Sequence, residues 1–283
     1  MFPARGSLKP TWPVRPQQLS EADVDQVSPS QHVLITGAGS GIGAAIARRF
    51  AASGANVSLA GRRSAPLEAL ADELGACALA VSSFDVTDPA AIQSGLAAAR
   101  EAFGPVTILV NNAGEAPSAP FEKTSLELWN HVLAVDLTGV FNVTQAVLPD
   151  LKASGQPARI INIASTAGLT GYAYVSAYCA AKHGVIGLTR ALALELAKTR
   201  VTVNAVCPGF TDTPILTSAI DAITAKTGRS RDETLAEFTK HNPQGRLIRP
   251  EEVASTVAWL ASPDAGSITG QAIAVAGGEI QAG

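Results

Sequence analysis

The chain is poor in cysteine, in charge and in long apolar runs, and each shortage argues against a class of protein. Its three cysteines, Cys77, Cys179 and Cys207, form no CxxC pair and no metal-ligand spacing. The sequence therefore predicts no metal site and favours a reducing, cytoplasmic compartment. A net charge of −3 without runs of like charge argues against nucleic acid or an anionic membrane as the main partner. No uninterrupted apolar run reaches the roughly 18 residues of a membrane-spanning helix.

The first 30 residues differ in composition from the rest of the 283-residue chain. They contain five prolines, almost no apolar periodicity and no apolar stretch of the kind that a signal peptide needs. We expect residues 1–30 to be a disordered or loosely docked tail. Residues 31–283 are long enough for one catalytic domain with a well-buried core.

From His32 onward, short apolar strands alternate with longer helical patterns. The expected strands are HVLITG (32–37), ANVSLAG (55–61), CALAVSSFD (77–85), VTILVNNAG (106–114), ARIINIAS (158–165), TVNAVCPG (202–209) and QAIAVAGG (271–278). They are continuously apolar, as expected where helices cover both faces of a parallel sheet. The sequence therefore predicts an α/β fold, a doubly wound seven-stranded parallel sheet of the Rossmann type. Residues 214–249 interrupt this spacing and predict a small lid of two short helices above the sheet.

The segment TGAGSGIG (36–43) stands where the first strand meets the first helix. Glycines at such a turn let backbone N–H groups approach a pyrophosphate, and the helix N-terminus favours negative charge. The general GxGxxG spacing is not met strictly, and the spacing that fits is Gly37-x-x-x-Gly41-x-Gly43. Glycine clusters also serve plain tight turns. The strand before and the helix after this cluster favour nucleotide binding.

The end of the second strand bears on which nucleotide binds. A protein that binds NAD usually presents an acidic residue there to the ribose hydroxyls. This chain has Gly61, Arg62 and Arg63, and the nearest acid downstream is Glu68. Two guanidinium groups suit a 2′-phosphate, which arginine can bind through two hydrogen bonds. The two arginines therefore favour NADP(H) over NAD(H) as the cofactor. Alternatively, they form a basic turn that only faces solvent.

Tyr178 and Lys182 are four residues apart in SAYCAAKHG (176–184) and so share one face of a helix. A free tyrosine has a pKa of about 10, and a neighbouring ammonium group can lower that pKa towards neutrality. Ser165 stands at the carboxyl end of the fifth strand, the edge at which open α/β sheets bind ligands. Its hydroxyl could steady a developing oxyanion. Each residue alone could be ordinary packing, solvated surface or a cap, but their conjunction predicts an active site.

These motifs together resemble those of the short-chain dehydrogenase/reductase family, over about residues 31–283. The resemblance adds the segments Asp85-Val86, NNAG (111–114) and PGFTDT (208–213) to the glycine turn and the Ser165, Tyr178 and Lys182 set. It implies a seven-stranded parallel sheet, an NAD(P)(H) cofactor and a homotetramer or homodimer. It also implies cofactor contacts from further positions: Ser40, Ile42, Asp85, Val86, Asn112, Ala113, Gly114, Lys182, Pro208, Gly209, Thr211 and Thr213.

One position departs from the family pattern. Where the family usually has asparagine in a phrase such as VNLTG, this chain has VDLTG, with Asp136 at that place. In the family the backbone carbonyl at this position is thought to hold a water of a proton relay, and a backbone carbonyl survives the change. The aspartate side chain would add a negative charge near Lys182 or turn away from it. We count Asp136 among the catalytic positions and expect activity to be retained.

The implied activity interconverts a ketone and a secondary alcohol. The middle of the chain resembles 3-oxoacyl thioester reductases and polyketide ketoreductases, so the expected substrate is a small-molecule carbonyl, such as an acyl thioester. The alternatives are an NAD-dependent secondary-alcohol or hydroxyacyl-CoA dehydrogenase and a catalytically silent nucleotide-binding relative. Residues expected to line the substrate site are Tyr172, Tyr174 and Phe210, with Leu235 and Phe238 facing inward from the lid. Cys179 and His183 are expected to be structural.

Overall fold

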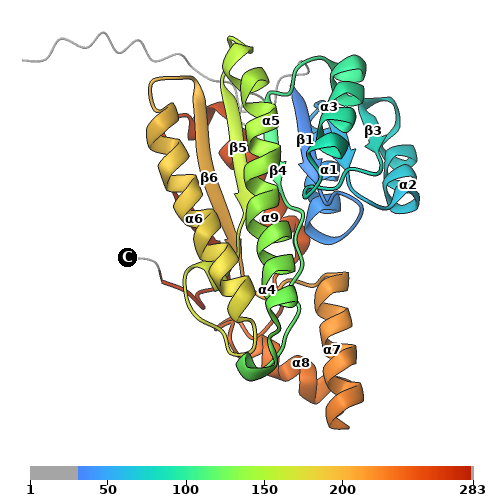
Figure 1. Ribbon diagram of the computed structural model, residues 1–283, viewed down its shortest axis with the longest axis vertical. Coiled ribbons are helices and arrows are strands. Elements are labelled where there is room, and N and C mark those ends of the chain that lie inside the picture. The colour runs from blue at the N-terminus through green and yellow to red at the C-terminus, as the bar shows by residue number, and fades with distance from the viewer. Residues whose placement is uncertain (1–30, 282–283) are drawn as a thin grey trace, which may run out of the picture.

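The computed structural model describes residues 31–281, and the expected tail, residues 1–30, lies outside the described residues. Seven strands form one parallel sheet in the order β3-β2-β1-β4-β5-β6-β7 (Figure 1). The strands are β1 (His32–Thr36), β2 (Asn56–Ala60), β3 (Ala78–Val81), β4 (Ile108–Asn111), β5 (Ala158–Ile163), β6 (Val201–Pro208) and β7 (Ala272–Val275). The order reverses between β1 and β4, so the predicted doubly wound Rossmann-type fold is confirmed.

Helices cover both faces of this sheet, as the continuously apolar strands required. One face carries α1 (Gly41–Ala52), α2 (Ser64–Leu74) and α9 (Pro250–Ala261), and the other carries α3 (Pro89–Phe103), α5 (Gly139–Ala153) and α6 (Ser176–Leu196) (Figure 1). Local sequence sets where these helices begin. In α3, the Asp88 side chain accepts a hydrogen bond from the Ala90 N–H, and Pro89 occupies the first turn.

The core contains two large apolar clusters, one on each side of the sheet, and Phe50 and Phe84 are among the largest fully buried side chains. A row of buried polar side chains lies on the α5 and α6 side of the sheet. Asn111 donates to Asn162, and Asn162 donates to Thr189 on α6, each at 2.9 Å. Because these partners are buried, the two donated bonds fix the relative positions of β4, β5 and α6.

The third strand is shorter than predicted and ends at Val81 instead of Asp85. The backbone turns at Ser83, which has a positive φ of 56°. This turn drives Phe84 into the core against Gly95, where an added Cβ would overlap the Phe84 ring. The final strand is likewise confined to Ala272–Val275.

A continuous helical segment, Leu126–Ala153, crosses the front of the molecule in Figure 1 as α4 (Leu126–Leu133), a π-helical turn η4 (Ala134–Thr138) and α5. By length and a mean hydropathy of 1.4 this segment is long and apolar enough to cross a membrane. Its buried residues, such as Val143 and Val147, belong to the core cluster between this segment and the sheet. Packing within the domain thus buries part of this segment, 44% of its most apolar 18-residue window.

Candidate active site

A cavity of about 1280 Å³ lies at the carboxyl ends of the strands. It is bounded by the turns that follow β1, β2, β4, β5 and β6, and by α7 (Pro214–Thr227) and α8 (Arg231–Thr239). Such a position, beside the point where the strand order reverses, is where open α/β sheets bind ligands. Of the predicted catalytic and cofactor-binding positions, all except Gly43 line this one cavity.

The glycine turn brings the N-terminus of α1 to the cavity wall. Gly37 and Gly41 have φ angles of 65° and 55°, which favour glycine. Ser40 is the N-cap residue, and its hydroxyl makes no capping bond to α1 within the described chain. Gly41 also lies close to Thr213, because a Cβ on Gly41 would be 3.1 Å from the Thr213 methyl group. The turn thus offers backbone N–H groups and a hydroxyl to an anionic group, and it fits a dinucleotide pyrophosphate.

Gly43 lies behind the turn and does not line the cavity, while its predicted part in cofactor binding stays a prediction. A Cβ on Gly43 would overlap the carbonyl oxygen of Gly37 and lie 2.6 Å from Asn112 Nδ2. Asn112 donates from Nδ2 to the carbonyl oxygens of Thr36 at 2.9 Å and Gly37 at 3.1 Å. The missing side chain at Gly43 therefore allows helix and turn to approach each other closely.

We expect Gly43→Ala to weaken cofactor binding at least about tenfold, because the added methyl group must push the Gly37 carbonyl out of place. Gly187→Ala is the matched control, since an added Cβ at this exposed position of α6 meets nothing within 4 Å. Alanine there should be neutral or stabilise the helix by about 0.5–1 kcal/mol. Titration of NADPH fluorescence against each purified variant measures the difference, and equal binding by both would contradict this role for Gly43.

Two arginines border the cavity beyond β2. Arg62 and Arg63 both line it, together with Asp85 and Val86 from the segment after β3. The Thr87 backbone N–H and hydroxyl donate to Asp85 Oδ1 at 2.9 and 2.8 Å. These bonds, the first above all, hold the pKa of Asp85 below its ordinary value, and the charge of Arg62 acts in the same direction. This end of the cavity is thus a basic rim beside an oriented carboxylate.

Ser165, Tyr178 and Lys182 meet at the other end of the cavity. Lys182 is buried, and its Nζ lies 5.4 Å from the centre of the Tyr178 ring. Nζ donates to the Ile163 carbonyl oxygen at 3.2 Å. Burial raises the pKa of Tyr178 above its ordinary value, while the positive charge of Lys182 and the hydroxyl of Ser165 act in the opposite direction. The three residues therefore share one small volume, as their spacing predicted.

Asp136 lies beneath this group, fully buried, at the π-helical turn η4. Its Oδ1 is 3.2 Å from Lys182 Nζ, and its carboxylate accepts from the Glu115 N–H at 3.3 Å. The side chain turns towards Lys182, which decides between the two orientations left open by the sequence. Gly114 makes room for it, because a Cβ there would lie 2.6 Å from Asp136 Oδ1. A π turn within an α-helix often marks a functional site, and no sequence pattern indicated this one.

The segment after β6 closes the cavity between the cofactor turn and the lid. Pro208, Gly209, Thr211 and Thr213 all line it. The Thr211 hydroxyl donates to the Gly209 carbonyl at 2.9 Å, and Thr213 is the N-cap residue of α7. Ala113 and Gly114 face the same space from the turn after β4. The predicted cofactor positions are thus gathered along one continuous wall.

Aromatic side chains form the wall on the lid side. The rings of Tyr172 and Phe210 meet edge to face at 5.8 Å, and Phe210 meets Phe238 of α8 at 5.0 Å. Tyr174 lies at the rim, 66% exposed, with a positive φ of 69°. The expected wall residues therefore line the cavity, but Leu235 does not, and its neighbour Thr234 is the buried residue of α8.

No sequence pattern pointed to His241, which lines this wall, or to Glu279, which bonds the wall residue Tyr172. The Tyr172 hydroxyl lies 2.5 Å from Glu279 Oε1, and His241 packs against the Tyr172 ring at 6.1 Å. Burial and the bond to Glu279 raise the pKa of Tyr172 well above its ordinary value. Glu279 lies beyond the last strand and in no motif, so only the three-dimensional fold brings it to Tyr172.

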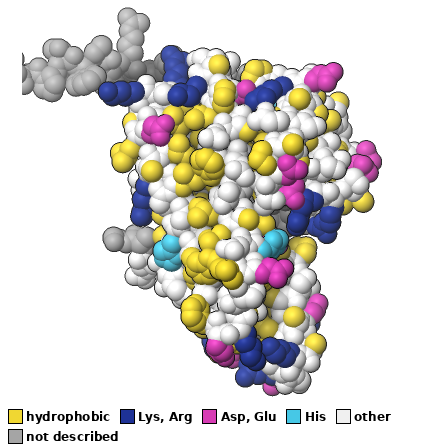
Figure 2. Space-filling view, in the orientation of Figure 1, with side chains coloured by type: hydrophobic (Ala, Val, Ile, Leu, Met, Phe, Trp, Pro, Cys, Tyr) yellow, Lys and Arg dark blue, Asp and Glu magenta, His cyan; other side chains and the backbone are white. Residues whose placement is uncertain are grey.

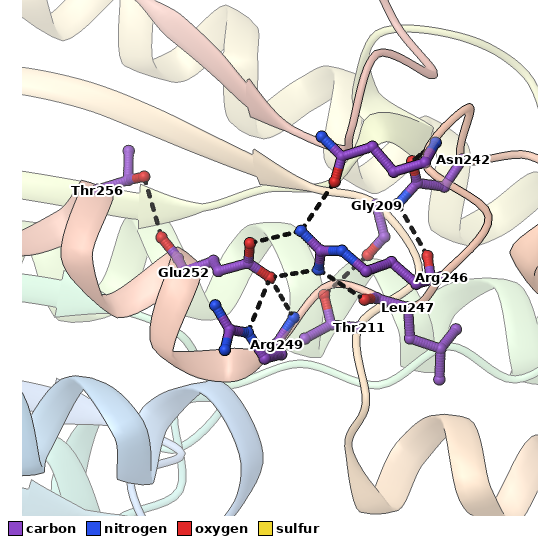
Figure 3. A network of polar contacts seen from close by, with 9 residues as sticks. Gly209, Thr211, Asn242, Arg246, Leu247, Arg249, Glu252 and Thr256 are labelled. Carbon is purple, nitrogen blue, oxygen red and sulfur yellow. Dashed lines mark hydrogen bonds and ion pairs between the residues drawn. The ribbon is translucent and has the colours of Figure 1, made fainter.

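A polar network fixes the base of the segment 240–249 (Figure 3). Arg246 donates to both carboxylate oxygens of Glu252, at 2.7 and 2.8 Å, and the Arg249 N–H donates to the same group at 2.8 Å. These bonds lower the pKa of Glu252 to about 2. Asn242 Nδ2 donates to the Arg246 carbonyl oxygen. The chain between α8 and α9 is thereby tied to the first turn of α9, so α7 and α8 stand on an anchored base.

The remaining titratable candidates are structural in this arrangement. His183 is exposed and bonds through Nδ1 to the Cys179 carbonyl one turn earlier. Cys179 Sγ lies 4.0 Å from the Tyr172 carbonyl oxygen. Within residues 31–281, no group of three His, Cys, Asp or Glu side chains could hold a metal ion.

Comparison with known proteins decides the family. Residues 31–224 match the family model described as short chain dehydrogenase. The chain belongs to the short-chain dehydrogenase family. Membership confirms the resemblance drawn from the motifs, and it makes this short-chain dehydrogenase a nicotinamide-dependent oxidoreductase that acts on CH–OH groups.

Three relatives show where this short-chain dehydrogenase lies within its family. It is 45% identical to the granaticin polyketide synthase putative ketoacyl reductase 1 of Streptomyces violaceoruber, over 87% of this chain and 91% of the relative. It is 39% identical to the D-beta-hydroxybutyrate dehydrogenase of Rhizobium meliloti, over 87% and 96%. A crystal structure of an actinorhodin polyketide ketoreductase variant with NADPH superposes with a TM-score of 0.84 at 40% identity, covering 90% of this chain and 98% of that one.

Proposed function

We propose that this short-chain dehydrogenase is an NADPH-dependent reductase of 3-oxoacyl thioesters or closely related ketones, with Tyr178 as the proton donor. The observation that carries the proposal is the convergence of Ser165, Tyr178 and Lys182 at one end of a cavity whose other end is bordered by Arg62 and Arg63. The first arrangement suits proton transfer to a carbonyl oxygen. The second suits the extra phosphate of NADP(H).

The residues at the catalytic end divide the work on the carbonyl group. A bound reduced nicotinamide supplies the hydride that the carbonyl carbon accepts. The Tyr178 hydroxyl donates its proton to the carbonyl oxygen, and the Ser165 hydroxyl donates a hydrogen bond that orients this oxygen. Lys182, held by the Ile163 carbonyl and by Asp136, places a positive charge beside the tyrosine. This charge stabilises the phenolate that remains after proton transfer.

The rest of the cavity wall fits the cofactor in order along its length. We assign the nicotinamide amide to Pro208, Gly209, Thr211 and Thr213, and the pyrophosphate to the turn of Gly37, Ser40, Gly41 and Ile42. The adenosine end falls to Asp85, Val86 and the two arginines. Ala113 and Gly114 flank the cofactor, while Asn112 and Gly43 brace the turn. The close packing of the turn against the segment after β4 supports this assignment, because a Cβ on Gly37 would lie 2.9 Å from Ala113 Cα.

Arg62→Asp should invert the cofactor preference, because a carboxylate repels a 2′-phosphate and accepts hydrogen bonds from a free ribose. We expect kcat/KM for NADPH to fall by about 10²-fold. The variant loses the charge-assisted contact between Arg62 and the 2′-phosphate, and the new carboxylate repels this phosphate. Arg200→Asp is the matched control. Arg200 directly precedes β6 and donates to the Gly155 carbonyl oxygen at the amino ends of the strands, the opposite end from the cavity. An unchanged NADPH to NADH ratio in Arg62→Asp would mean that the arginines only face solvent.

The substrate assignment rests on the lid-side wall and on the relatives. An apolar, aromatic wall of Tyr172, Phe210 and Phe238 suits an acyl chain or a ketide ring better than a sugar. One relative carries the name ketoacyl reductase. A panel of 3-oxoacyl thioesters, simple ketones and sugars, each with NADPH and NADH, tests the assignment. Highest kcat/KM with a 3-oxoacyl thioester and NADPH supports it, and highest kcat/KM with a sugar overturns it.

The 39% identity to a D-beta-hydroxybutyrate dehydrogenase favours one alternative, the oxidation of a 3-hydroxy acid or hydroxyacyl thioester in catabolism. The same panel separates the two, because that alternative predicts faster turnover with the alcohol and NAD⁺.

We further propose a cytoplasmic homotetramer or homodimer, with the face over α5 and α6 as a subunit contact. Figure 2 shows several hydrophobic side chains exposed on this face. The exposed hydrophobic residues of the chain include Phe141 of α5, 47% exposed, and Leu194 of α6, 81% exposed. Burying such side chains in a second copy would remove them from water. Residues 214–249 act as the substrate lid in this proposal.

A further inference from the structure

The catalytic lysine is already ion-paired within the protein. Lys182 Nζ lies 3.2 Å from Asp136 Oδ1, and both side chains are buried, with exposed fractions of 4% and 0%. The Asp136 carboxylate has a second partner in the Glu115 N–H. A buried ion pair with additional hydrogen bonds is a fixed arrangement, because parting the charges would leave each of them desolvated and unpaired.

The groups that face this pair come from several elements. Lys182 is faced by Asp136 of η4, Tyr178 of α6 and Cys207 of β6. Asp136 is faced by Lys182 and, more weakly, by Glu115 of the turn after β4. Around Tyr178 the charged or titratable groups are Lys182, Asp136 and Cys179, with the Ser165 hydroxyl beside them. Within the described chain, Lys182 is the cation of this set and Asp136 is the carboxylate in contact with it.

This pairing changes what Tyr178 experiences. An isolated ammonium group 5.4 Å from the ring centre would stabilise the phenolate strongly in a desolvated site. A carboxylate at 3.2 Å from the same ammonium turns that single charge into a dipole, and the field of a dipole falls off faster with distance. The lysine therefore keeps its position while much of its charge is offset by Asp136.

We propose that Asp136 is a positioning residue that holds Lys182 in place and, by offsetting its charge, keeps Tyr178 in the neutral, proton-donating form at neutral pH. The site is thereby set for carbonyl reduction, in which Tyr178 begins protonated, and alcohol oxidation becomes fast only at higher pH. The equilibrium of the overall reaction is unaffected, because Asp136 changes only the protonation state of the enzyme. This inference rests on the proposed function, in which Tyr178 transfers the proton.

The directions of the pKa shifts agree with this geometry. Burial raises the pKa of Tyr178, and Asp136 raises it further against the lowering effect of Lys182. Burial alone would lower the pKa of Lys182, but the charge of Asp136 outweighs it with the help of Tyr178, so that the pKa of the lysine is raised. The lysine thus stays protonated, and the tyrosine stays neutral, through the physiological range.

The test is a direct titration of Tyr178 in the protein without cofactor. The chain has three tyrosines, Tyr172, Tyr174 and Tyr178, so NMR of protein labelled with 13C at tyrosine Cζ gives three signals, and Tyr178→Phe assigns the third. In the wild type, the pKa of Tyr178 should lie above the ordinary tyrosine value of about 10. In Asp136→Asn its pKa should fall by about 1 unit or more, the size of a single close charge effect. Glu115→Gln removes a neighbouring carboxylate and its contact with His131 but keeps the Glu115 N–H and the Asp136–Lys182 contact. It should shift the pKa of Tyr178 by less than about 0.5 units.

Two results would overturn the inference: a wild-type Tyr178 pKa below the ordinary tyrosine value of about 10, or a Tyr178 pKa that Asp136→Asn leaves unchanged. The first needs no variant, so it decides even if Asp136→Asn does not fold. Kinetics add a second readout, because the alkaline limb of kcat/KM for reduction should move to lower pH in Asp136→Asn by the same shift. The turnover of Tyr178→Phe tests the proposed function separately. Full turnover in this variant would refute Tyr178 as proton donor, whereas the Tyr178 titration alone decides the effect of Asp136.

Discussion

Tyr178→Phe is expected to lower kcat for carbonyl reduction by about 10²–10⁴-fold, the range that a positioned general acid contributes. The substitution removes one hydroxyl from a half-buried ring and leaves the ring packed among Val132, Ala177 and Ala181. The carbonyl oxygen then has no proton donor at the correct place. NADPH consumption at saturating substrate measures the effect, and NADPH binding should remain within about twofold of the wild type, because the cofactor contacts are untouched.

Tyr174→Phe is the matched control, since it removes the same hydroxyl from an exposed tyrosine at the rim of the same cavity. Its kcat should stay within about threefold of the wild type. If both variants kept wild-type turnover, or if both lost it equally, Tyr178 would not be the proton donor.

Lys182→Met should destabilise the protein by about 3–5 kcal/mol, in addition to any loss of activity, because it leaves Asp136 as a buried carboxylate without its counter-ion. Methionine keeps nearly the length and apolar stem of lysine, so the loss reports the charge. Chemical denaturation of the apoprotein measures it. The double variant Lys182→Met/Asp136→Asn should recover most of the stability while remaining inactive, because neither charge is then left unpaired.

The pH dependence of this loss follows from the direction of the Asp136 shift. Burial raises the folded-state pKa of Asp136 above its unfolded value. The folded state therefore holds a proton that the unfolded state has released, and stability falls as pH rises between the two values. In Lys182→Met, where the lysine no longer opposes the shift, the deficit should be smaller at pH 5 than at pH 8. A deficit that is equal at both values, or additive single effects in the double variant, would contradict the ion pair.

The fold and most of the candidate site could be predicted from the sequence because both follow from local patterns. Continuous apolar strands such as residues 106–114 require helices on both faces, and parallel strands bring their carboxyl ends to one edge. Ser165 at a strand end and Tyr178 and Lys182 on one helical turn were therefore certain to approach one another once the fold was correct. The glycine turn at 36–43 was predictable for the same reason.

The parts that sequence did not reveal depend on contacts between distant segments. Glu279 reaches Tyr172 only because the last strand lies beside β6. The direction of the Asp136 side chain depends on a π turn, which has no sequence signal, and on the space left by Gly114. The glycine spacing did not reveal that the close approach of α1 to the turn places Gly43 behind the wall. The positions of these three residues therefore depend on packing between distant segments.

The central claim is that this short-chain dehydrogenase reduces the ketone of a 3-oxoacyl thioester at the site of Tyr178. The most direct measurement is product analysis after incubating the wild-type enzyme with acetoacetyl thioester and NADPH deuterated at the transferable position. The account predicts one 3-hydroxyacyl thioester per NADPH consumed, with deuterium at C3, and none from Tyr178→Phe. No 3-hydroxy product from the wild type, or equal product from Tyr178→Phe, would contradict it.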